Sequence, residues 1–188
     1  MEKIIEKAFI NSFNDLCCQV NEKTFRHINE SVYRYLFIKH LPEGIGVEDE
    51  WHRIDLLLHD PEFQYPIEFK LYDTRPLFLI GMDEQGKKGG AGNKNFQEFL
   101  NSAKKLAELR NENFYLKKRC NFKKSYFVLI AGDRLETGKK RFDYWYCDQN
   151  RHLAALAKMD IKSQVIAQEE CVKSSLKIFG WVIEVGLT

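Results

Sequence analysis

The sequence contains no apolar run long enough to span a membrane. Residues 1–7 include acids where a signal peptide would have a continuous apolar core. Cysteine is sparse: the five cysteines are odd in number and include no C-x-x-C pair, which argues against both a disulfide framework and a zinc site. We therefore expect a cytoplasmic protein with reduced thiols and no membrane association.

The chain also lacks a strong excess of one charge. Its 29 Lys and Arg residues nearly balance 27 Asp and Glu residues, for a net charge of +2. A nucleic-acid partner would therefore have to be held by a local basic patch. No repeat or low-complexity tract divides the sequence, and 188 residues are enough for one sizeable core. A single domain over residues 1–188 is expected.

Two neighbouring apolar runs, 53–58 and 66–71, each carry charges. Side chains alternate between the two faces of a strand, so Glu68 and Lys70 share one face of the second run. The intervening Asp60-Pro61-Glu62-Phe63 favours a type I turn. In an antiparallel hairpin folded about this turn, positions summing to 123 face each other. Asp55 is then opposite Glu68.

Two carboxylates in this arrangement are in electrostatic conflict. Like charges opposite each other destabilise a strand pair, and their proximity raises one pKa unless a cation lies between them. A divalent metal ion would resolve the conflict. Lys70 lies two residues after Glu68 on the same face of the strand. Its ammonium would then be close enough to act on a group bound to the metal.

The pattern resembles the motif of the PD-(D/E)xK nuclease superfamily: an Asp, a spacer of about a dozen residues, and Glu-x-Lys on the next strand. The resemblance implies that Asp55 and Glu68 bind Mg²⁺, that the backbone carbonyl of Phe69 adds a ligand, and that Lys70 positions or activates the attacking water. It also implies a restriction-endonuclease-like α/β fold, with a mixed central sheet flanked by helices. Ile54 stands where the name of the motif has Pro.

The rest of the sequence is consistent with that layout. Apolar periodicity predicts helices over about 2–20, 23–40 and 94–108 and a short one over 153–159. Strands are predicted over about 51–59, 65–73, 126–131 and 178–185, and 141–147 is a further candidate.

Glu30 on the second predicted helix has two interpretations. Many superfamily members carry a helical Glu that points into the metal site, which makes Glu30 a candidate metal ligand. Arg26 and Arg34 lie four residues to either side, where ordinary surface ion pairs form. Both interpretations stay open at this stage.

A glycine-rich loop, 86–94, follows an apolar segment and precedes a helix. This is the order of a phosphate-binding P-loop, but the Gly-Lys-[Ser/Thr] signature is absent. The loop lysines Lys87, Lys88 and Lys94 are candidate DNA phosphate contacts, and a surface loop without function is the alternative. Lys104, on the polar stripe of the following helix, is a further candidate DNA contact or a solvated side chain.

The sequence thus predicts an Mg²⁺-dependent DNA endonuclease, of a type II restriction or defence kind, in which Mn²⁺ substitutes for Mg²⁺. A homodimer is expected, because two symmetric sites most easily cut both strands of a duplex. The main alternative is a catalytically inactive nuclease fold that binds DNA or protein. A nucleotide-binding protein using loop 86–94 is the other alternative.

Overall fold

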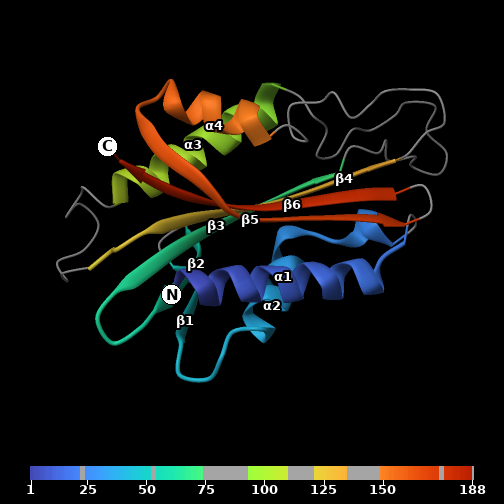
Figure 1. Cartoon of the computed structure of the whole chain (residues 1–188), viewed down its shortest axis with the longest axis horizontal. Helices are drawn as coiled ribbons and strands as arrows, with labels where there is room; N and C mark the ends of the chain where they lie inside the picture. The colour runs from blue at the N-terminus through green and yellow to red at the C-terminus, as the bar shows by residue number, and fades with distance from the viewer. Residues whose placement is uncertain are drawn as a thin grey trace.

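The computed structural model describes residues 1–21, 24–51, 54–73, 93–109, 121–134, 149–173 and 176–187. In this part of the chain one mixed sheet has the order β1-β2-β3-β4-β6-β5 (Figure 1). Its strands are β1 Gly46–Trp51, β2 Ile54–His59, β3 Gln64–Asp73, β4 Ser125–Arg134, β5 Ile161–Lys173 and β6 Leu176–Leu187. The helices are α1 Glu2–Gln19, α2 Glu30–Lys39, α3 Asn93–Leu109 and α4 Gln149–Ala157, with a 3-10 turn, η1 Phe25–His27.

Helices cover both faces of the sheet. Helices α1 and α2 lie on one face, and α3 and α4 lie on the other (Figure 1). The α1–α2 side buries residues that include Phe9, Phe13, Phe37, Leu56, Leu58, Ile67, Phe69, Val128 and Ile130. The α3–α4 side buries Phe99, Leu106, Tyr72, Phe127, Leu129, Trp181 and Ile183, among others. The predicted α/β class with a mixed sheet flanked by helices is confirmed.

Strand direction changes at the centre of the sheet. β3 and β4 run parallel, whereas β1–β2, β2–β3, β4–β6 and β5–β6 are antiparallel. Parallel neighbours need a crossover connection, and α3 lies between them in sequence and packs on the face opposite α1 and α2. β3 is consequently covered by helices on both faces.

The turn that joins β2 to β3 is centred on Pro61 and Glu62, where the sequence placed it. Its first residue, Asp60, accepts hydrogen bonds through Oδ1 from the backbone N–H groups of Glu62 (3.0 Å) and Phe63 (2.8 Å). Tyr65 donates its hydroxyl to the other oxygen of Asp60 at 2.9 Å. The two backbone hydrogen bonds and the tyrosine hydroxyl hold the pKa of Asp60 below its ordinary value. The aspartate therefore fixes the length of the loop and with it the register of the hairpin.

The structure differs from the predicted helices and strands in three places. Helix α2 begins at Glu30 rather than near residue 23, because the Asn29 side chain caps it by accepting the Val32 N–H at 2.9 Å. The strand predicted over 51–59 corresponds to β2, Ile54–His59, and the preceding strand β1, Gly46–Trp51, was not predicted. β5 was not predicted, because it is a polar edge strand whose buried positions are few. The candidate strand over 141–147 lies outside the described residues.

No helix in the described ranges is long and apolar enough to cross a membrane.

The contact between α1 and β6 leads to a stability prediction. A Cβ atom on Gly180 of β6 would come within 2.8 Å of ring atoms of Phe9 and Phe13 and within 2.9 Å of Ile130. Gly180→Ala is therefore expected to lower the free energy of unfolding by about 1–3 kcal/mol through overpacking, as measured by urea denaturation. A variant as stable as the wild type would contradict this close packing.

Candidate active site

Asp55 and Glu68 come from neighbouring antiparallel strands. Leu56 pairs with Ile67 in the β2–β3 ladder, which confirms the predicted register in which paired positions sum to 123. Next to Leu56, Asp55 joins β2 to β3 through its side chain: its Oδ2 accepts the backbone N–H of Phe69 at 2.7 Å. The Asp55 carboxylate is thereby held against the segment of β3 that carries Glu68 and Lys70.

Glu68 is a buried carboxylate, with 4% of the residue exposed to solvent. It forms an ion pair with Lys105 of α3, which places its side chain on the α3 side of the sheet. The pKa of Glu68 is raised to about 7: burial is the main cause and the Asp55 charge adds to it, while Lys105 and Lys70 lower the pKa and offset part of the rise. The two carboxylates are thus close enough for one to affect the protonation of the other.

Lys70 and Glu30 form the second ion pair of the site. The Lys70 ammonium lies 3.3 Å from Oε1 and 3.5 Å from Oε2 of Glu30. Glu30 Oε1 also accepts the Leu71 backbone N–H at 3.3 Å. Because Asn29 caps α2, Glu30 is the first helical residue and can reach from the end of the helix to β3. The structure therefore brings Glu30 to the predicted site through Lys70.

Arg34 forms ion pairs with three acids, whereas the sequence suggested a surface ion pair with Glu30. Its guanidinium lies 3.3 Å from Asp55 Oδ1, 2.8 Å from Asp49 Oδ1 and 3.1 Å from Glu50 Oε1. Only 7% of its side chain is exposed. Glu50 has a positive φ of 51°, which is unusual for a residue with a side chain. The Arg26 side chain lies outside the described residues.

Arg34 and Lys105 are the two cations of this site that the sequence reasoning missed. A signal for Arg34 existed, since it lies four residues after Glu30 and so on the same side of α2. For Lys105 no local signal existed, because its partner Glu68 is 37 positions earlier (105 − 68) and belongs to another element. Only the packing of α3 on the sheet brings the two side chains together.

The donor atoms at Asp55 and Glu68 suit a hard divalent cation. Mg²⁺ prefers oxygen ligands and binds through one or two carboxylates while it keeps several waters. Two neighbouring carboxylates, one with a raised pKa, are also a pair that a cation would relieve. Across the described ranges, no three His, Cys, Asp or Glu side chains gather into a ready-made metal cluster. Asp55 and Glu68 are therefore the side chains whose chemistry suits Mg²⁺, and the Phe69 carbonyl stays a predicted ligand.

The candidate DNA contacts remain predictions. Lys87 and Lys88 lie outside the described residues, as does the side chain of Lys94, which belongs to the first turn of α3. Most of the glycine-rich loop is likewise outside them. Lys104 is an exposed residue of α3 whose ammonium lies 3.4 Å from Glu108, one turn later.

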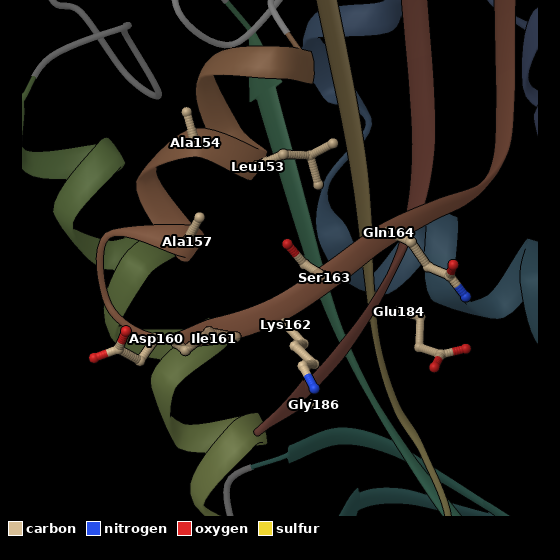
Figure 2. Close-up of a pocket in the computed structure, with 10 residues that line it drawn as sticks. All are labelled: Leu153, Ala154, Ala157, Asp160, Ile161, Lys162, Ser163, Gln164, Glu184 and Gly186. Atoms are coloured by element: carbon tan, nitrogen blue, oxygen red, sulfur yellow. The ribbon is translucent and has the colours of Figure 1, made fainter. Parts of the chain in front are cut away.

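An open pocket of about 790 Å³ lies at the other end of the sheet (Figure 2). Leu153, Ala154 and Ala157 of α4 border it on one side, and residues of β5 and β6 border it on the other. Of the described residues predicted for the site, none lines this pocket. The acids are on β2 and β3, whereas this pocket is on the far edge formed by β6 and β5.

The raised pKa of Glu68 leads to a prediction about stability and pH. The ordinary value is 4.5 and the folded-state value is about 7, so between these pH values the folded protein binds more protons than the unfolded chain. Stability therefore falls as pH rises through this window, by up to about 3 kcal/mol. In Glu68→Gln this contribution is absent.

Urea denaturation at pH 5, 6, 7 and 8 measures the effect as the difference between wild type and Glu68→Gln. The difference should shift steadily in favour of the variant as pH rises. A difference that stays constant over this range would show that Glu68 has an ordinary pKa.

Comparison of the chain with protein-family models, with curated proteins and with solved structures found no match. A function for this protein is therefore inferred from the geometry and electrostatics of these residues.

Proposed function

We propose that this protein is an Mg²⁺-dependent DNA endonuclease of the PD-(D/E)xK type, with a restriction-endonuclease-like fold. The observation that carries the proposal is the hydrogen bond from the Phe69 N–H to Asp55. It joins the first acid of the motif to the peptide between the second acid and the lysine. A hairpin whose acids simply faced water would not need this contact.

The surroundings of the hairpin support the same assignment. A capped helix delivers Glu30 to the lysine of the motif, whereas the superfamily resemblance made Glu30 a candidate metal ligand. The strand after the hairpin, β4, runs parallel to β3 after a helical crossover. Glu68 is also buried among helices rather than solvated, which counts against the amphipathic-hairpin interpretation.

Each residue then has a chemical role. Asp55, Glu68 and the Phe69 carbonyl would hold the metal ion, which when bound supplies a polarised water and neutralises charge on the phosphate oxygens. Lys70 orients the attacking water and stabilises the negative charge that develops during hydrolysis. Glu30 holds the Lys70 ammonium in place through two contacts. Because Glu68 must be ionised to bind metal, metal affinity should rise with pH up to about 8.

A restriction or defence enzyme that works as a homodimer fits this proposal, since two symmetric sites would address the two strands of a duplex.

One observation favours a second candidate, a nuclease-like fold that binds DNA or protein without cutting. Each acid already has a cationic partner: Arg34 for Asp55, Lys105 for Glu68 and Lys70 for Glu30. In this second candidate the ion pairs serve the structure alone. An assay for DNA cleavage distinguishes the endonuclease from the binding protein.

Supercoiled plasmid incubated with Mg²⁺ or Mn²⁺ tests the enzyme directly. We expect nicked and linear products with either metal and none with EDTA. Lys70→Ala should reduce the cleavage rate at least about 100-fold, because it removes a group that stabilises the transition state. Asp55→Asn and Glu68→Gln should do the same by weakening metal binding.

Lys7→Ala is the control, because Lys7 is an exposed lysine of α1 and is not among the predicted site residues or DNA contacts. It should cleave at a rate close to that of the wild type. If folded wild-type protein cuts neither DNA nor RNA with any divalent metal, the binding module is the correct proposal.

A further inference from the structure

Lys105 is the least expected member of the site. It projects from α3, on the opposite side of the sheet from α1 and α2, and its ammonium forms an ion pair with Glu68 Oε1. About 36% of its side chain is exposed, against 5% for Glu68. The contact therefore joins a buried carboxylate to a side chain that keeps access to solvent.

A buried, ionised carboxylate requires a compensating positive charge nearby. Leaving a buried ion without its partner is costly, and Asp55 adds a second negative charge close by. The other two cations of the site are engaged elsewhere: Lys70 by Glu30, and Arg34 by Asp55 together with Asp49 and Glu50. Lys105 is thus the cation that the fold supplies to Glu68.

A divalent cation held by Asp55 and Glu68 would need the oxygen that Lys105 contacts. An ammonium and a dication at the same carboxylate also repel each other. The exposed part of the Lys105 side chain allows the ammonium to leave the carboxylate without the helix moving.

We propose that Lys105 is a positioning residue that holds Glu68 in the metal-free protein and competes with a divalent cation for its carboxylate. This inference rests on the proposed function, because it takes Glu68 as a metal ligand. Lys105 orders the carboxylate before the metal arrives and sets how much metal is needed to occupy the site. When a divalent cation binds, it replaces the Lys105 ammonium at the Glu68 carboxylate.

The adjacent lysine of the same helix is a natural control. Lys104 has the same chemistry and nearly the same position in sequence, but it is 58% exposed and its partner is Glu108. Any effect of removing a positive charge from α3 in general appears in both variants. An effect of competition for Glu68 appears only at Lys105.

The experiment is calorimetric titration of Mn²⁺ alone into the folded full-length protein at pH 8, without DNA. Lys105→Met keeps the length of the side chain and removes the competing charge, so Mn²⁺ should bind roughly tenfold more tightly than to the wild type. Lys105→Arg retains the charge and should bind Mn²⁺ with nearly wild-type affinity. Lys104→Met should also match the wild type.

Thermal unfolding of the same proteins gives a second readout. Without metal, Lys105→Met should unfold at a lower temperature than the wild type, and saturating Mn²⁺ should raise its Tm by more than it raises that of the wild type. Lys105→Gln, a second neutral variant, gives the same comparison if the methionine variant does not fold.

The outcomes separate this inference from the proposed function. Wild-type protein that binds Mn²⁺ and cleaves DNA, with unchanged affinity in Lys105→Met and Lys105→Gln, would overturn the competition and leave the nuclease intact. Equal tightening in Lys104→Met would overturn it as well, because the effect would be general. Wild-type protein that neither binds Mn²⁺ nor cleaves would overturn both.

Discussion

The candidate site depends on the hydrogen bond between the Phe69 amide and the Asp55 carboxylate. A carboxylate that accepts a backbone N–H from the neighbouring strand replaces a ladder contact with a side-chain contact. This hydrogen bond keeps the Asp55 side chain against β3 even though the ladder of backbone pairs between the two strands ends with Leu56 and Ile67. Without it, the two acids would be joined only by strand register, and the spacing between them would be loose.

A second constraint is the balance of charge within the site. Glu30, Asp55 and Glu68 are matched by Lys70, Arg34 and Lys105, which come from β3, α2 and α3. Separate elements therefore meet through ion pairs, and each pair is partly or wholly shielded from solvent. Each acid thus has a compensating cation, and removing one partner of a buried pair would leave an uncompensated charge.

The sheet explains why this chemistry is located on β3. Helices pack on both faces, so β3 is enclosed and its Glu68 side chain is removed from bulk water. Enclosure raises the pKa of Glu68 and strengthens every electrostatic interaction nearby. The open pocket between α4 and the β5–β6 edge lacks these features (Figure 2). Charge and burial point to the hairpin.

The sequence by itself determined the hairpin, because local chemistry controls it. The Asp60 turn sets loop length, alternation assigns faces, and together they predict that Asp55 lies by Glu68 with Lys70 alongside. The long helices were also predictable from apolar spacing. The partners of the acids were decided only by the tertiary structure, since Lys105 and Arg34 reach the site from helices whose packing no local pattern encodes. The edge strands β1 and β5 escaped prediction for a related reason: an edge strand buries few side chains, so its sequence carries little hydrophobic signal.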